Sequence, residues 1–312
     1  MNYMTHSRHY TTQHALSEEH HYLPKSNYLF DLDYLSVIQV DGEKASDFLQ
    51  GQLSCDLRAI TMDRMQQGLM CNLKGRIMAI LDVVLMSNQS VGLVAPTDLS
   101  DNIQNALAKP AALSRVQLHQ ATLKLYGLFV QNKTDSFFFE RALPEERYGV
   151  VHTDKGCCYK IDESYYICMI EPETADTFCA PFISQKQYRG SLAWQVLQLQ
   201  HHRVNIYPES RGLFLPHRLD MHLSGYINFE KGCYKGQEII ARMHYRSTQK
   251  YKLVHFILDT EVELKAELSV YAQDGQTVVG EVIDYALIKP HQYIIVASVL
   301  ISHKGSYTLI TN

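Results

Sequence analysis

The pattern of apolar residues changes near residues 247–250, and this change limits the folds that the chain can adopt. Before it, stretches with helical spacing alternate with stretches of strand character. After it, almost no helical spacing occurs. Five strand-like segments follow instead, at residues 251–258, 268–271, 277–285, 293–300 and 307–311. Because a run of short strands is typical of a barrel, we expect a closed or nearly closed β-barrel over residues 248–312.

The region from residue 25 to 247 has mixed patterning. Alternating residues predict a strand over 34–40, and apolar spacing predicts a helix over 43–53. Two apolar runs joined by Lys74-Gly75 predict a hairpin, and a further helix begins at Ser191. We therefore expect an α+β fold class with two subdomains, formed by residues 25–115 with 190–247 and by residues 116–189.

The first 24 residues are polar and have neither strand nor helix periodicity. They are expected to form a flexible N-terminal extension. Five histidines lie there, at positions 6, 9, 14, 20 and 21, and loose solvated side chains are the favoured interpretation over metal ligands.

Charge and hydropathy exclude several classes of protein. The net charge of −4 gives no support for a general nucleic-acid binder. No apolar run approaches the roughly 20 residues of a membrane helix, and no secretory signal is recognisable at the N-terminus. The cytoplasm is the expected location. The seven cysteines form no CxxC pair, so most are expected to be small buried residues in a reducing compartment.

Cys233 has neighbours that set it apart from the other cysteines. Gly232 and Gly236 bracket it and allow a tight turn. Lys231 and Lys235 flank it, and a helix is expected to begin just after Gly236. Two ammonium groups and a helix N-terminus would favour the reactive thiolate. The alternative interpretation is a small buried residue in a turn.

The segment from Lys231 to Arg242 resembles the signature of the YgfZ family of folate-binding proteins, relatives of the glycine-cleavage T protein. The matching positions are Lys231, Gly232, Cys233, Tyr234, Gly236, Gln237, Glu238 and Arg242. Residues 48–52, FLQGQ, and residues 72–76, NLKGR, resemble two further elements of that family. The resemblance extends from about residue 28 to 250.

This resemblance implies a T-protein-like fold, with two α+β units and a barrel around an opening that binds tetrahydrofolate or a derivative. It implies an accessory protein for iron–sulfur enzymes, including tRNA-modifying ones, rather than a conventional enzyme. The expected partners are folate and iron–sulfur client enzymes or assembly proteins. Cys233, with Lys231 and Lys235, would supply a reactive thiol facing the opening.

Four residues are candidates for binding the flat pterin ring of the folate. Trp194 and Tyr34 occupy the positions where the family places aromatic residues, and Gln200 stands where many relatives have a glutamate. Lys74 lies at the turn of the predicted hairpin. Core packing is the alternative role for both aromatic residues. Histidines 201, 202, 217 and 222 show no metal-ligand spacing, so no metal site is assigned.

A folate-dependent aminomethyltransferase is the main alternative function. The T protein has an acidic pair that aligns here with Ala79 and Ile80, which argues against that activity. Asp82 lies close by, on the same strand face as Ile80 and opposite to Ala79. Direct binding of tRNA is disfavoured by the net charge.

Overall fold

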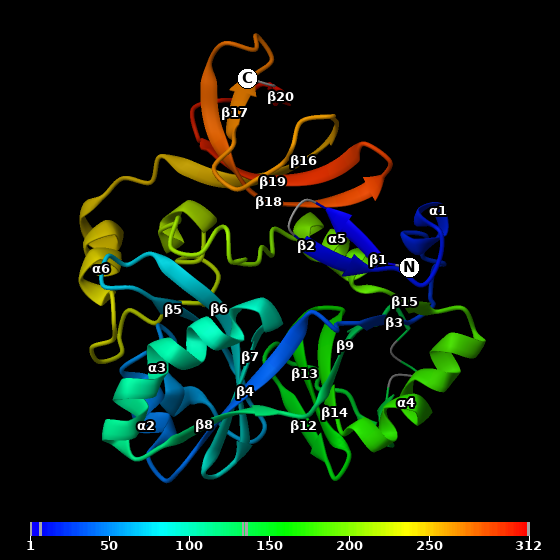
Figure 1. Ribbon diagram of the computed structural model, residues 1–312, viewed down its shortest axis with the longest axis vertical. Helices are drawn as coiled ribbons and strands as arrows, with labels where there is room; N and C mark the ends of the chain where they lie inside the picture. Colours follow the sequence, from blue (N-terminus) through cyan, green and yellow to red (C-terminus); the bar gives the residue numbers. More distant parts are fainter. Residues whose placement is uncertain (1, 6–7, 133, 135–136, 311–312) are drawn as a thin grey trace.

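Three β-sheets form the body of the molecule, which is a computed structural model that describes residues 2–5, 8–132, 134 and 137–310. Figure 1 shows two sheets side by side in the lower half and a third, strongly curled sheet above them. The helix α5 (Ser191–Gln200) lies at the centre, between the C-terminal sheet and the sheet below it. The central position of α5 decides where the candidate site forms.

The first sheet is antiparallel throughout. Its strands, in spatial order, are β5 (Gln66–Cys71), β6 (Ile77–Ser87), β7 (Ser90–Pro96), β4 (Leu35–Asp41) and β8 (Gln117–Ala121). Its helical elements are α2 (Ala45–Gln50), η1 (Leu57–Ala59), η2 (Thr97–Leu99) and α3 (Ser100–Ser114). Phe48 of α2 and Ile103 of α3 belong to the buried core of this sheet. The predicted strand at 34–40, helix at 43–53 and hairpin at Lys74-Gly75 are confirmed, the helix in shorter form.

The second sheet has helices on both faces. Its strands, in spatial order, are β12 (Val150–Thr153), β13 (Gly156–Asp162), β14 (Tyr165–Ile170), β9 (Lys124–Phe129), β3 (Tyr28–Asp31) and β15 (Tyr188–Arg189); β10 (Phe137–Phe138) and β11 (Arg141–Ala142) pair separately. Helix α4 (Pro172–Ser184) packs on one face through Cys179, and α5 packs on the other through Trp194. Residues 191–199 of α5 are all buried because the helix is covered on both sides.

The C-terminal sheet is a curled half-barrel. Its strands, in spatial order, are β16 (Tyr251–Asp259), β19 (Gln292–Leu300), β18 (Val278–Lys289), β17 (Ser269–Ala272) and β20 (Tyr307–Thr308). The register shifts between Val282 and Asp284, and such a bulge bends a strand. The expected α+β fold and C-terminal barrel are confirmed, although β16 and β20 do not pair within the described residues.

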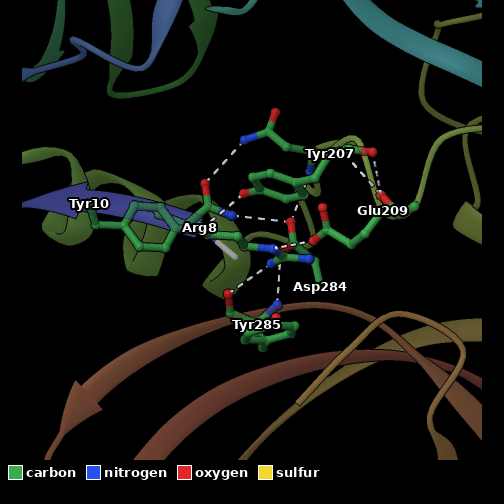
Figure 2. Close-up of polar contacts among 9 residues, drawn as sticks. Arg8, Tyr10, Tyr207, Glu209, Asp284 and Tyr285 are labelled. Atoms are coloured by element: carbon green, nitrogen blue, oxygen red, sulfur yellow. Dashed lines mark hydrogen bonds and ion pairs between the residues drawn. The ribbon is translucent and has the colours of Figure 1, made fainter. Parts of the chain in front are cut away.

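The described part of the N-terminal segment forms strands and a short helix, although the sequence has no matching periodicity; the flexibility expected over residues 1–24 stays a prediction. Strands β1 (Asn2–Thr5) and β2 (Arg8–Thr11) form a hairpin, followed by α1 (Leu16–Glu19). Arg8 inserts between α5 and β18, where its guanidinium Nη1 lies 2.5 Å from Asp284 Oδ1 (Figure 2). Its Nε donates to Glu209. Long-range burial of one cation therefore orders a segment that has little local periodicity.

Two further elements, η3 (Pro216–Leu219) and α6 (Gln237–Arg246), lie in the connection between α5 and the C-terminal sheet. The proposed division of residues 25–247 into two subdomains stays a prediction. Strand β3, in the segment assigned to the first subdomain, pairs within the second sheet. None of the helices in the described residues is long and apolar enough to cross a membrane.

Candidate functional site

A narrow cavity lies where both lower sheets meet α5. Its volume is about 70 Å³, which corresponds to a few water molecules. The side chains around it come from the first and second sheets and the residues beside them, from α5 and from the segment after α5. They are Tyr34, Leu35, Gln67, Ile80, Asp82, Val94, Ala95, Pro96, Ile161, Ile167, Trp194, Gln198, Arg203, Val204, Asn205 and Tyr226. The structure thus brings the two predicted aromatic residues, Trp194 and Tyr34, to one cavity.

The indole of Trp194 packs against one face of the second sheet. Gly127 of β9 lies directly beneath it, and a Cβ there would come within 2.5 Å of the ring. The rings of Phe30 and Tyr165 flank the indole at centroid distances of 5.3 and 5.8 Å. The absence of a side chain at Gly127 therefore leaves space for the indole against the strand. The neighbouring aromatic rings fix the orientation of the indole.

Asp82 supplies a carboxylate to the same cavity. Gln67 Nε2 donates to its Oδ1 at 2.8 Å, and the hydroxyl of Tyr159 donates to its Oδ2 at 2.9 Å. Burial raises the pKa of Asp82, although these hydrogen bonds and the charge of Arg203 oppose the shift. The predicted strand facing is confirmed, since Ile80 and Asp82 both line the cavity while Ala79 is fully buried elsewhere.

Gln198, rather than Gln200, is the amide of α5 at the cavity. Gln200 is exposed at the end of the helix. Gln198 is 6% exposed, and its Nε2 has no hydrogen-bond partner among the described residues. A buried donor without a partner costs free energy, so this position favours a ligand that presents an acceptor.

A wider cavity of about 290 Å³ adjoins the narrow one. Arg203, Val204 and Tyr226 line both. The wider cavity also contains Arg147 and Asp162. Arg203 is held at the junction by an ion pair with Asp162, at 2.5 Å between Nη2 and Oδ2. The junction of the two cavities therefore carries both a guanidinium and a carboxylate.

The three motif segments meet at the turn between β5 and β6. Gly75 at this turn and Gly236 in the cysteine segment both have positive φ, 69° and 87°. A Cβ on Gly236 would lie 2.5 Å from the carbonyl oxygen of Asn72. Only glycine tolerates both the dihedral angle and the close approach. The backbone N–H of Lys235 donates to Gly51, which attaches the FLQGQ segment.

Lys231 fixes the cysteine segment to the rest of the fold. Its Nζ donates to the carbonyl oxygens of Gln50, Leu53 and Cys55 at 2.8, 2.7 and 2.6 Å. Burial lowers the pKa of this amine to about 8, so it is mostly protonated at pH 7. Each of its three hydrogens has a backbone acceptor, so the ammonium attaches this segment to the chain near residue 50, and its predicted influence on the thiol stays a prediction.

Cys233 is exposed, and it does not line the cavity around Trp194. The expectation that the thiol faces a folate opening stays a prediction, and this cavity gives it no support. Of the other motif residues, Tyr234 is buried, Gln237 is half-buried, and Glu238 and Arg242 are exposed on α6. A Cβ on Gly232 would meet open space. Lys74 is exposed at the turn, also outside the cavity around Trp194. The thiol is thus presented to the surroundings of the molecule.

Sequence reasoning missed three polar groups of the cavity: the carboxylate of Asp82, the amide of Gln198 and the guanidinium of Arg203. A signal existed for Gln198, because it follows Trp194 by four residues and so shares its helix face. Strand alternation correctly put Asp82 on the same face as Ile80, but the sequence analysis assigned it no role in the cavity. Arg203 lies in a loop, where no periodicity predicts the direction of a side chain.

Comparison with known proteins relates the chain to one group. Residues 1–131 match the family model described as the GCVT N-terminal domain. The chain is 25% identical over 244 residues to the tRNA-modifying protein YgfZ of Colwellia psychrerythraea, covering 77% of this chain and 74% of that protein. It is 25% identical over 225 residues to the YgfZ protein of Photobacterium profundum, covering 71% and 67%.

The fold also matches a solved structure. The glycine cleavage system aminomethyltransferase T from Bartonella henselae aligns with a TM-score of 0.72 at 15% identity, over 92% of this chain and 82% of the other. At this identity the match establishes the shared architecture.

Proposed function

We propose that this chain, a relative of the YgfZ proteins with the fold of an aminomethyltransferase T protein, binds a reduced folate and supports the maintenance of iron–sulfur enzymes, including tRNA-modifying ones. The observation that carries the folate part is the cavity between Trp194 and Tyr34. It combines an aromatic wall with the carboxylate of Asp82 and the Nε2 of Gln198, which has no hydrogen-bond partner among the described residues.

The chemistry of a pterin suits this cavity. A pterin is flat and can stack on an aromatic ring, and the cavity of about 70 Å³ must widen for it to reach the indole. Its polar edge carries N–H groups and a carbonyl oxygen. Asp82 can accept from the former, and Gln198 Nε2 can donate to the latter. The tail of the folate carries carboxylates, and Arg203 and Arg147 in the wider cavity have the charge to bind them.

The exposed position of Cys233 supports a macromolecular partner for the thiol. Its loop is fixed by Lys231 and by the close contact of Gly236 with the β5–β6 turn, yet the cysteine itself is open to solvent. A preorganised thiol on the surface can reach a client iron–sulfur enzyme or an assembly protein. A ring bound beside Trp194 would lie in a cavity that Cys233 does not line.

The position of Asp82 also favours a second candidate, a folate-dependent aminomethyltransferase. A carboxylate lies in the folate cavity although Ala79 and Ile80 replace the acidic pair of the T protein. Hydrogen bonds from Gln67 and Tyr159 already hold both oxygens of Asp82. Turnover of tetrahydrofolate with a purified amine donor would establish this activity, and its absence would leave the accessory role.

Titration with tetrahydrofolate is expected to quench the fluorescence of Trp194, the single tryptophan of the chain. Asp82→Asn should weaken binding by about tenfold or more, because a charge-assisted hydrogen bond becomes a neutral one. Cys233→Ala should bind as wild type yet fail to support iron–sulfur enzyme activity in cells. Unchanged fluorescence at saturating folate, measured with the folded wild-type protein, would disprove the folate assignment.

Folate affinity is expected to fall on acidification, at a higher pH than an ordinary aspartate would give. Burial raises the pKa of Asp82 above 3.8, and protonation removes the acceptor that the pterin requires. The same shift means that ionisation of Asp82 lowers folding stability as the pH rises from 3.8 through the raised pKa. The measurement is the pH profile of the dissociation constant, and Asp82→Asn should flatten it.

A further inference from the structure

Three histidine rings gather beside the largest of the described cavities, outside the folate site. His217 lies on η3, His222 follows it in the connecting loop, and His244 lies on α6. Their ring centres are 4.5, 6.4 and 6.5 Å apart. The adjoining cavity has a volume of about 630 Å³. Chain folding, and not sequence spacing, brings these rings together.

The hydrogen bonds of Gln249 determine the tautomer of His222. Gln249 Nε2 donates to Asp220 Oδ1 at 2.6 Å and to the carbonyl oxygen of Tyr251 at 3.0 Å, which fixes its Oε1 as the atom facing His222. His222 Nε2 lies 3.2 Å from that oxygen and must carry the hydrogen. The lone pair of His222 therefore resides on Nδ1, which is buried and has no partner among the described residues.

His217 has the same deficit in a stronger form. Both of its ring nitrogens are buried without a hydrogen-bond partner in the part of the chain that the structure describes. Neutral imidazoles with unshared lone pairs are the form in which histidine binds metals.

We propose that His217, His222 and His244 form a site for a divalent transition metal of the zinc class. With metal–nitrogen bonds of about 2.0–2.1 Å in a tetrahedron, the centres of three bound rings lie roughly 5–6 Å apart. One observed spacing, 4.5 Å, is below this range and two, 6.4 and 6.5 Å, are above it, so the rings must shift to bind one ion. The hydrogen bond from His222 to Gln249 has the form of the outer contacts that orient metal-bound histidines.

Binding requires small side-chain rotations. No three His, Cys, Asp or Glu side chains among the described residues are arranged to hold a metal ion as they stand. The ring of His244 is stacked on Phe229 at 3.8 Å, and it must turn toward His217. His244 is exposed on α6 and free to do so at modest cost. The neighbouring cavity leaves the fourth position of a tetrahedral ion open to water or another ligand.

The test is a metal titration of the full chain after removal of any affinity tag and treatment with a chelator. Zn²⁺ affinity is measured by competition with a chromophoric chelator, and Co²⁺ supplies a visible spectrum. We expect one tight equivalent, which His217→Gln and His222→Gln each weaken by about 100-fold. Gln249→Leu should weaken it by about 10–100-fold, since an outer-contact partner is lost.

His202→Gln is the matched control, because His202 Nε2 already pairs with His255 Nδ1 at 2.9 Å. It should bind Zn²⁺ as wild type, and so should the double variant His9→Gln/His14→Gln. Thermal unfolding in chelator establishes that each variant is folded, and added Zn²⁺ should raise the midpoint of wild type but not of His217→Gln. Wild-type affinity in His217→Gln, or an equal loss in His202→Gln, overturns the proposal.

Discussion

Replacing Arg8 with alanine is expected to lower the free energy of unfolding by about 3–5 kcal/mol, because it leaves a buried carboxylate without its counter-charge. The side chains of Arg8 and Asp284 are 2% and 0% exposed. The guanidinium also lies between the rings of Tyr207 and Tyr285, 3.7 and 4.0 Å from their centres (Figure 2). Both stacking contacts are lost with the charge.

Arg8→Ala should also disturb the residues that line the proposed folate cavity. Asp284 Oδ2 accepts from the backbone N–H of Asn205 at 2.9 Å and from Gln195 of α5 at 3.1 Å. Asn205 lines the cavity and Gln195 neighbours Trp194. We therefore expect weaker folate binding in Arg8→Ala, even under conditions where the variant is folded.

Equilibrium unfolding in urea measures the effect on stability. Arg58→Ala is the control, since Arg58 forms its ion pair with Asp56 on the surface and should leave the transition unchanged. Adding Asp284→Asn to Arg8→Ala should recover part of the lost stability, because the unpaired charge is removed. A transition for Arg8→Ala equal to that of wild type would show that the buried pair contributes nothing.

Replacing Lys231 with methionine is expected to lower the free energy of unfolding by about 3 kcal/mol or more and to abolish the function of Cys233. Three charge-assisted hydrogen bonds disappear, and the carbonyl oxygens of Gln50, Leu53 and Cys55 lose their shared donor. Methionine keeps the apolar stem, so the effect reports on the ammonium. The cysteine loop would no longer be anchored to the FLQGQ segment.

Lys235→Met is the matched control. The contact of Lys235 that the structure describes comes from its backbone N–H, which the substitution keeps. Its unfolding transition should match wild type. Complementation of iron–sulfur enzyme activity in cells, compared with Cys233→Ala, separates anchoring from chemistry: Cys233→Ala should lose function with normal stability. A stable Lys231→Met protein with full function would contradict the anchoring role.

Local patterns predicted the local structure well. Apolar periodicity over residues 43–53 and strand alternation over 34–40 report which face of an element is buried, and both elements form where expected. The helix at Ser191 and the strand-rich C-terminus follow the same logic. The two aromatic residues assigned to the folate position, Trp194 and Tyr34, meet at one cavity.

Such local patterns could not predict contacts between segments that are distant in the sequence. The order of residues 8–11 depends on Asp284, and the role of Lys231 depends on carbonyl groups near residue 50. A sequence does not show which backbone carbonyl groups will lie near a given side chain. The position of Lys231 beside Cys233 therefore suggested a role in thiol chemistry. Gln200 was chosen because it stands where many relatives have a glutamate, and its role in binding stays a prediction; the amide that lines the cavity around Trp194 is that of Gln198.

The pairing of Arg8 with Asp284 sets a condition on the order in which the protein can be made. The two residues are 276 positions apart. At about 5–20 residues per second, a ribosome needs roughly 14–55 s to travel that far. Throughout this interval the hairpin of β1 and β2 lacks its anchor. The first and second sheets have all their residues once Arg189 has been added, and they can assemble before Asp284 is made. The earliest segment to leave the ribosome is thus among the last to settle, and β18 is the element that it must await.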